Sequence, residues 1–245
     1  MIELCNLTKK FGEFTAVSDV TLTVPGGEVF GFIGPNGAGK TTTIRIIGGI
    51  LAPTSGSVRI CGIDMAREPE KAKARIGFIP DRPYLYEKLT AIEFLRFTSD
   101  LYGVDTASFY DRAISMLRLF SLEQWKDILI ESFSHGMKQR LIMAGALLHD
   151  PDVLVVDEPM VGLDPAGIRM VMELFRKLAA SGVAVFMSTH TLAVAQDVCD
   201  RVGVINHGRL IAVGTIEDLM EKTDAGRPDL EEVFFRLTQE QDGDG

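Results

Sequence analysis

The sequence predicts an α/β protein with an N-terminal antiparallel β subdomain, a core lobe built on a parallel sheet, and an α-helical subdomain inserted into that lobe. Three patterns predict this fold class. Residues 1–30 alternate polar and apolar positions, which is typical of antiparallel strands with one solvent-facing side. Apolar runs at 29–33 and 153–156 are each followed by a helical pattern, as in parallel α/β units. Residues 87–149 show helical spacing without an intervening strand.

The N-terminal elements follow from these patterns in order. The antiparallel strands are expected to turn at Pro-Gly-Gly, residues 25–27, before the buried strand at 29–33. A glycine-rich loop at 34–42 leads into a helix over 41–51. Three helices are expected in the inserted subdomain, over 87–103, 109–120 and 136–150.

The core lobe is expected to resume after these helices. The predicted elements are a buried strand at 153–156, a helix at 165–182, a strand at 183–190 and a hairpin at 201–214. Residues 216–238 are expected to form two short helices, and residues 241–245 to be disordered. The chain is therefore predicted to be one domain over 1–245, with core lobe 1–86 and 150–215, helical subdomain 87–149 and C-terminal extension 216–245.

Composition and charge argue against several classes of protein. The chain of 245 residues has a net charge of −9, so it has no excess of basic residues for contacts with nucleic-acid phosphates. Its apolar runs are short, such as 141–148, against the roughly 20 residues that cross a bilayer. The N-terminus lacks the apolar segment of a secretory signal. We therefore expect a cytoplasmic protein that reaches a membrane only through a partner.

GPNGAGKTT, residues 34–42, matches the phosphate-binding pattern G-x-x-x-x-G-K-[ST]. Its glycines let backbone N–H groups turn toward phosphate oxygens without Cβ clashes. Lys40 would place its charge at the β- and γ-phosphates, and the Thr41 hydroxyl would bind Mg²⁺. The loop lies between a predicted strand and a predicted helix, which is the context that this motif requires.

Two carboxylates follow the buried strand at 153–156. Asp157 lies where P-loop NTPases hold hydrated Mg²⁺, and Glu158 is the candidate to orient and deprotonate the attacking water. Such a pair can also be an ordinary strand exit, and it is the phosphate loop that favours the functional interpretation. His190 ends another apolar strand, and ligands gather at the carboxyl ends of parallel strands, so we expect it at the same crevice.

SFSHGMKQR, residues 132–140, begins the third predicted helix of the inserted subdomain. Ser134 is placed as an N-cap, but Met137 stands where a capping box would have Glu or Gln. Lys138 and Arg140 follow in the first turns, with the wrong sign for the positive end of a helix dipole. This helix start therefore indicates a site for an anion supplied from elsewhere.

Other residues are interpreted without a catalytic role. His149 and His207, at a helix end and a turn, are expected to be exposed to solvent. Three cysteines, far apart and odd in number, predict neither a disulfide framework nor a zinc site. Tyr84 and Tyr86 could form an exposed patch for a partner or pack in the core.

Together, these motifs resemble the ATP-binding-cassette (ABC) ATPases, the nucleotide-binding subunits of ABC transporters. The resemblance covers about residues 3–215 and includes every family motif in order. Residues 34–42 are similar to the Walker A motif, 153–159 to Walker B, 161–164 to the D-loop and 188–190 to the H-loop. FSHGM, at 133–137, resembles the LSGGQ signature that separates this family from other P-loop proteins. The resemblance implies a RecA-like P-loop NTPase lobe that hydrolyses ATP with Mg²⁺.

The resemblance also assigns roles to individual residues. Those implied to bind ATP are Phe11, Gly34, Pro35, Asn36, Gly37, Ala38, Gly39, Lys40, Thr41 and Thr42, with Phe11 stacked on adenine. Those implied in catalysis are Lys40, Glu158 and His190, with Thr41 and Asp157 as Mg²⁺ ligands and Asp164 as the D-loop acid. The signature residues Ser134, His135, Gly136 and Met137 would face ATP held by a second copy of the chain.

Two departures from the family pattern bear on function. The signature has Phe133, His135 and Met137 where the consensus has Leu, Gly and Gln, a form that resembles the branch serving exporters with separate permease subunits. At the Q-loop, residues 76–83, Asp81 replaces the usual Gln. A carboxylate there could hold Mg²⁺ through water, but it also brings a negative charge close to the γ-phosphate.

The expected function is that of an ATPase subunit that dimerises around two ATP molecules and powers a membrane exporter. Its partners would be a second copy or a paralogous ATPase, and a permease docked at the Q-loop and helical subdomain on the cytoplasmic face of the membrane. One alternative is a soluble ABC-type ATPase in translation, DNA repair or cofactor assembly. Another is a regulatory module that binds ATP and hydrolyses it slowly, which Asp81 favours and Glu158 opposes.

Overall fold

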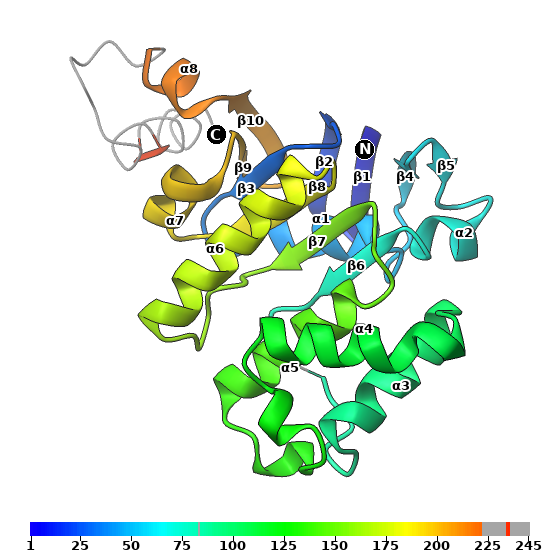
Figure 1. Ribbon diagram of the computed structural model, residues 1–245. Coiled ribbons are helices and arrows are strands. Elements are labelled where there is room, and N and C mark those ends of the chain that lie inside the picture. Colours follow the sequence, from blue (N-terminus) through cyan, green and yellow to red (C-terminus); the bar gives the residue numbers. More distant parts are fainter. Residues whose placement is uncertain (83, 222–233, 236–245) are drawn as a thin grey trace.

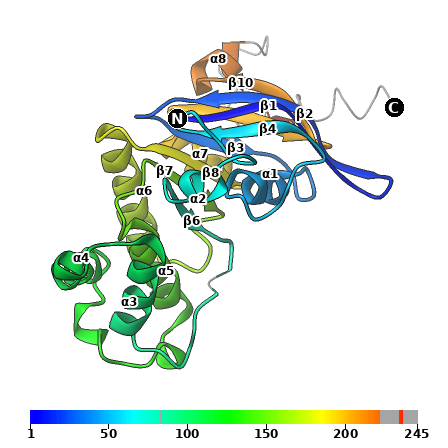
Figure 2. The ribbon, with the colours of Figure 1, turned by 90° about the vertical axis from the view of Figure 1, so that its right-hand side faces the viewer.

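The computed structural model describes residues 1–82, 84–221 and 234–235, and it confirms the α/β fold class. Its strands form two sheets that lie close together, and three helices project from one end of the second sheet (Figures 1 and 2). Of the C-terminal extension predicted at 216–245, the structure describes α8 (Ile216–Glu221) and residues 234–235. The remainder, including the tail expected to be disordered, lies outside the described residues.

The first sheet is antiparallel, with strand order β2-β1-β4-β5. Its strands are β1 (Ile2–Phe11), β2 (Phe14–Val24), β4 (Ser55–Ile60) and β5 (Ile63–Asp64). The chain turns at 26–27, within the predicted 25–27, but this turn is not the hairpin of the first sheet. The hairpin turns at 12–13, where Gly12 has φ +58° and Phe11 pairs with Phe14. Residues 25–27 instead carry the chain from β2 into the second sheet.

The second sheet contains the buried strands and has the order β10-β9-β3-β8-β7-β6. Its strands are β3 (Val29–Ile33), β6 (Ile76–Ile79), β7 (Val153–Asp157), β8 (Ala184–Thr189), β9 (Arg201–Asn206) and β10 (Arg209–Gly214). All neighbouring pairs are parallel except the predicted hairpin of β9 and β10. Every residue of β3, β7 and β8 is buried, because both faces of the sheet are covered.

The two faces of this sheet pack against different partners. Phe30, Phe32 and Phe186 join one core with α1 (Lys40–Ile47) and the antiparallel sheet. Leu154 and Val185 join a second core with α6 (Pro165–Ala180) and the helical subdomain. Helix α7 (Leu192–Val198) precedes β9. Helix α1 is shorter than predicted because Gly48 and Gly49 follow it, the latter with φ +66°.

The three predicted helices of the inserted subdomain are confirmed; two are shorter than predicted, whereas the second begins three residues earlier, at Thr106. They are α3 (Ala91–Tyr102), α4 (Thr106–Leu119) and α5 (His135–Leu147). Strands β4, β5 and β6 and the short helix α2 (Pro69–Lys73) are not predicted by the sequence patterns. Strand β4 begins with Ser-Gly-Ser, which is typical of a loop, and it becomes a strand through its pairing with β1. None of the helices in the described residues has the length and apolarity needed to cross a membrane.

Candidate functional site

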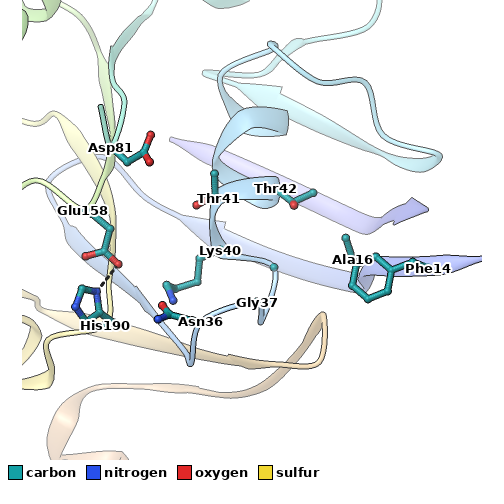
Figure 3. Close-up of a pocket in the computed structure, with 11 residues that line it drawn as sticks. Phe14, Ala16, Asn36, Gly37, Lys40, Thr41, Thr42, Asp81, Glu158 and His190 are labelled. Atoms are coloured by element: carbon teal, nitrogen blue, oxygen red, sulfur yellow. Dashed lines mark hydrogen bonds and ion pairs between the residues drawn. The ribbon is translucent and has the colours of Figure 1, made fainter. Parts of the chain in front are cut away.

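A cavity of about 420 Å³ opens at the carboxyl edge of the second sheet (Figure 3). We call it the P-loop pocket. Loops that follow β3, β6, β7 and β8 bring to it five residues that the sequence predicts as functional: Lys40, Thr41, Asp81, Glu158 and His190. Asn36, Gly37, Gly39 and Thr42 of the glycine-rich loop complete the same wall. The four loops are distant in sequence, so only the parallel sheet brings these groups together.

The glycine-rich loop has little room for side chains. A Cβ atom on Gly34 would lie 2.4 Å from the Ile205 carbonyl oxygen. Gly39 has φ +109°, and its Cβ would lie 2.4 Å from the Ala16 carbonyl oxygen. Gly39 is also the N-cap of α1, which has no side-chain cap and no acid in its first turn. The N–H groups at this helix start therefore remain available to an anion.

Lys40 lies inside this loop and is held by backbone oxygens. Its Nζ donates to the carbonyl oxygens of Gly34, at 2.7 Å, and Pro35, at 3.0 Å. Burial lowers the pKa of Lys40 below its usual value, and the nearby carboxylates of Glu158 and Asp157 oppose that shift. A buried ammonium group that reaches two carbonyls is poised to exchange them for phosphate oxygens. Among the other predicted loop residues, Ala38 is buried and does not line the pocket.

Asp157 and Thr41 present oxygen donors of the kind that Mg²⁺ takes. Asp157 is 2% exposed, and its Oδ1 accepts a hydrogen bond from Ser188 Oγ at 2.5 Å. Ser188, next to the last residue of β8, is a positioning residue to which the sequence patterns gave no individual role. Its position could have been noticed from the sequence, because it lies near the carboxyl end of a predicted buried strand, as Asp157 does. One carboxylate and one hydroxyl fit Mg²⁺, which keeps several waters and shares substrate phosphates.

Glu158 and His190 are in contact on one side of the P-loop pocket. His190 Nδ1 lies 2.9 Å from Glu158 Oε1, and the histidine is the more exposed of the two side chains (Figure 3). Glu158 has φ +50°, in the left-handed region that non-glycine residues rarely adopt. Its N–H faces the backbone oxygen of Ser188 at 3.3 Å. Backbone and imidazole together fix the direction of this carboxylate.

Phe14, and not Phe11, lines the P-loop pocket. The two rings are cross-strand neighbours at the β1–β2 hairpin, and both are at least half exposed. The Lys9 ammonium lies 5.1 Å from the centre of the Phe11 ring. Phe14 is thus a candidate for stacking on a nucleotide base that the family pattern did not point to, and Ala16 lies beside it on the wall.

The predicted signature residues lie in a second cavity of about 780 Å³, which we call the signature pocket. Ser134, His135 and Gly136 line it together with Asp164, whereas Met137 packs against the hydrophobic core. Ser134 is the N-cap of α5, as predicted, and its Oγ accepts from the N–H of Met137 at 3.3 Å. The two pockets share no lining residue.

Of the two bases beside this helix start, Arg140 lines the signature pocket as predicted, whereas Lys138 does not. Lys138 forms an ion pair with Glu87 at 2.5 Å. Arg140 donates to the carbonyl oxygens of Gly136 and Phe120, each at 3.3 Å. The cap itself has no acid in its first turn, so the backbone N–H groups, Ser134 and Arg140 are the groups that could meet an anion there.

His149 is also placed differently from the prediction. It is partly buried, and its ring stacks on Tyr102 with centroids 3.8 Å apart. Its Nε2 lies 3.1 Å from the Ile76 carbonyl oxygen, while its buried Nδ1 has no partner among the described residues. Burial lowers the pKa of His149. His207, as predicted, is exposed.

This chain is similar to known proteins in both sequence and structure. The family model described as ABC transporter matches residues 17–161. The linearmycin resistance ATP-binding protein LnrL of Bacillus subtilis is 37% identical over 91% of this chain and 71% of that protein. The probable multidrug ABC transporter ATP-binding protein YbhF of Escherichia coli is 37% identical over 99% of this chain, which spans 42% of that protein. The Nod factor export ATP-binding protein I of Ralstonia nicotianae is 38% identical over 87% of this chain and 67% of that protein.

Solved structures share the whole architecture. The ATP-binding subunit of an ABC transporter superposes with a TM-score of 0.91 at 35% identity, covering 97% of this chain and 99% of that one. A dimer of the ATP-binding cassette MJ0796 with ADP and phosphate gives a TM-score of 0.81 at 30% identity, covering 88% of this chain and 98% of that one. The family model, the sequence relatives and the shared fold together show that this chain belongs to the ABC transporter ATP-binding family.

Proposed function

We propose that two copies of this chain enclose two ATP molecules, hydrolyse them with Mg²⁺, and thereby drive a membrane exporter. One observation is the main support for a dimer: the P-loop pocket and the signature pocket lie on the same chain but share no lining residue. Each pocket presents groups that could bind a phosphate, and neither presents the groups of the other. Two such chains placed head to tail would join the P-loop pocket of one copy to the signature pocket of the other.

On the P-loop side, the residues of one chain would bind the triphosphate. Lys40 would exchange its two backbone carbonyls for β- and γ-phosphate oxygens, and the N–H groups at the start of α1 would hold the same anion. Thr41 and Asp157 would hold Mg²⁺, and Ser188 fixes the Asp157 carboxylate. When bound, the metal would neutralise charge on the phosphates.

Glu158 is proposed as the acceptor of a proton from the attacking water. A general base must lie within hydrogen-bond reach of that water with its lone pairs directed correctly. His190 lies 2.9 Å from the Glu158 carboxylate and keeps it facing the pocket. Most of the catalysis would come from positioning and charge neutralisation, as in other phosphoryl transfers.

On the signature side, Ser134 and Gly136 would meet the γ-phosphate bound by the partner. Ser134 is exposed, and its hydroxyl can donate to a phosphate while it caps the helix. His135, which replaces a family glycine, lies against Gly162 of the D-loop segment. Asp164 caps α6 through a 3.0 Å hydrogen bond from Gly167 N–H, so the D-loop is fixed beside the signature.

A permease is proposed as the membrane partner, with this chain peripheral on the cytoplasmic face. Relatives carry the names of a linearmycin resistance protein, a multidrug transporter protein and a Nod factor export protein, which supports an export role. Tyr84 and Tyr86 are 78% and 61% exposed beside the helical subdomain. Tyr86 meets Phe97 of α3 edge to face at 5.2 Å, which links the segment after β6 to the inserted helices.

Mixed dimers test the proposed arrangement. A Lys40→Ala chain or a Ser134→Arg chain on its own is expected to have no intact ATP site, whether or not it pairs with a second copy of itself. A dimer with one chain of each kind restores one intact site, because the wild-type loop of one chain meets the wild-type signature of the other. Nucleotide trapped per dimer, measured with vanadate and labelled ATP, reports that site.

The matched control places both substitutions in one chain and pairs it with a wild-type chain. There the proposed arrangement leaves no intact site. If this control traps nucleotide and the complementary dimer does not, the signature acts within its own chain and the sandwich is wrong. A wild-type chain that binds ATP without hydrolysing it would instead favour a regulatory module.

A further inference from the structure

Asp81 is a second carboxylate at the P-loop pocket, in the loop after β6, the strand beside the one that precedes Glu158. Strands β6 and β7 are parallel neighbours in which Ile79 pairs with Val156. Asp81 and Glu158 each lie two residues beyond that pair, and both line the pocket (Figure 3). Neighbouring strands are about 4.8 Å apart. The two carboxylates therefore leave the same edge of the sheet side by side.

The two carboxylates differ in what holds them. His190 lies 2.9 Å from Glu158 and fixes its direction. Asp81 is half-buried, and within residues 1–82, 84–221 and 234–235 it has no hydrogen bond or ion pair. The ammonium group of Lys40 is engaged by two carbonyl oxygens and forms no ion pair with Asp81. Asp81 is thus an uncommitted acceptor facing the space where phosphate and water would enter.

An uncommitted carboxylate is unfavourable for binding a phosphate, because like charges repel. That repulsion falls if the carboxylate takes up a proton while the γ-phosphate is attacked. An interaction that improves between the bound state and the transition state raises kcat rather than affinity. An amide at this position could not accept the proton, whereas a carboxylate can.

We propose that Asp81 is a second proton acceptor for ATP hydrolysis, acting in parallel with Glu158. In this step the water oxygen bonds to the γ-phosphorus, and the β–γ bridging P–O bond breaks with its electron pair left on ADP. One proton of the water moves to the Asp81 carboxylate and is later released to solvent. The inference rests on the proposed ATPase function and adds a catalytic residue to it.

Single-turnover hydrolysis of Mg-ATP tests this role in four variants. They are Glu158→Gln, Asp81→Asn, the double variant, and Glu158→Gln with Asp81→Glu. Asp111→Asn, which removes an exposed carboxylate of α4 outside both pockets, is the matched control. Binding of a fluorescent ATP analogue is measured for every variant, so that affinity and chemistry are separated.

We expect Glu158→Gln to slow hydrolysis by about 10²- to 10⁴-fold and to leave a residual rate. Asp81→Asn alone slows it by less than about tenfold, because Glu158 remains. Added to Glu158→Gln, Asp81→Asn lowers the residual rate by at least about another tenfold without weakening nucleotide binding. Asp81→Glu keeps the residual rate, since it keeps a carboxylate.

Three outcomes would overturn the proposal. The first is no residual rate in Glu158→Gln, and the second is an equal rate in that variant and the double variant. The third is recovery of the double variant at high Mg²⁺, which would assign Asp81 to metal binding. A wild-type chain that binds ATP but does not hydrolyse it would overturn the proposed function as well. That result differs from failure of the Asp81 proposal alone, in which the wild type hydrolyses ATP and the rates of the variants can be compared.

Discussion

Gly37 and Gly39 both have positive φ angles in the glycine-rich loop, but they face different surroundings. A Cβ on Gly39 would meet the Ala16 carbonyl oxygen at 2.4 Å, whereas a Cβ on Gly37 would meet nothing within 4 Å. This pair of residues separates the two reasons for glycine in a phosphate loop. One reason is the backbone angle, and the other is the space left for a side chain.

Gly39→Ala is therefore expected to weaken nucleotide binding and stability more than Gly37→Ala. Gly37→Ala carries only the cost of the left-handed backbone, about 1–2 kcal/mol. Gly39→Ala adds a clash with backbone that cannot rotate away. Urea unfolding and titration with a fluorescent ATP analogue measure the two effects. Equal losses in the two variants would contradict the contribution of the close contact.

His149 is expected to make stability depend on pH. Burial lowers its pKa below the usual value of about 6.5. The unfolded chain therefore takes up a proton at this residue at a higher pH than the folded chain does. Above about pH 6.5 the contribution of His149 to stability is fully present, and it is lost as the pH falls through the lowered pKa of the folded state.

Replacing this histidine tests the effect. His149→Phe keeps an aromatic ring for the stack on Tyr102 but removes the ionisable group. We expect the variant to be less stable at neutral pH, because the Ile76 carbonyl oxygen loses its partner. Its free energy of unfolding should fall less steeply than that of the wild type between pH 7 and pH 5. The free energies come from urea unfolding at each pH. If they fell equally steeply with pH in the variant and in the wild type, the assignment to His149 would be contradicted.

At the scale of elements, helix α5 depends on a cap that also belongs to the proposed ATP site. Ser134 Oγ accepts from the Met137 N–H at 3.3 Å. Helix α3 has a comparable but purely structural cap, because Thr90 and Glu93 form a capping box. The cap of α5 lies in the signature pocket and the cap of α3 does not, so the effect of removing a cap can be compared between the two helices.

Ser134→Ala and Thr90→Ala are each expected to lower the free energy of unfolding by about 1 kcal/mol. Only Ser134→Ala should also reduce ATP-dependent dimerisation, because only that hydroxyl lies in the signature pocket. Urea unfolding measures the first effect, and light scattering in Mg-ATP measures the second. Loss of dimerisation in both variants would mean that helix stability alone is responsible.

At the scale of the whole molecule, the two separate pockets predict that assembly depends on nucleotide. Glu158→Gln should keep ATP binding, slow hydrolysis and accumulate as a dimer in Mg-ATP. Lys40→Ala should stay monomeric under the same conditions, since it lacks the charge that binds the phosphates. Size-exclusion chromatography with light scattering distinguishes the two. A Glu158→Gln chain that remained monomeric in saturating Mg-ATP would count against the ATP sandwich.

The sequence was sufficient where a local pattern reports a local environment. Unbroken apolar runs at β3 and β7 predict strands buried on both faces, because such strands have no solvated side. Helical spacing predicts α3, α4 and α5, and the pattern of the loop at 34–42 predicts its place between a strand and a helix. The N-cap role of Ser134 could also be predicted, because an N-cap hydrogen bond joins residues only two or three positions apart in the sequence.

Tertiary structure decided everything that depends on contacts between distant segments. Strand β4 exists because β1 pairs with it, and the buried position of His149 exists because Tyr102 and Ile76 surround it. Ser188 supports Asp157, and Asp81 lies beside Glu158, because parallel strands far apart in sequence end at one edge of the sheet. Sequence periodicity describes which face of a segment is buried, but not which segment covers it. The residue types of the site could thus be predicted from the sequence, whereas their partners followed only from the packing of the sheet.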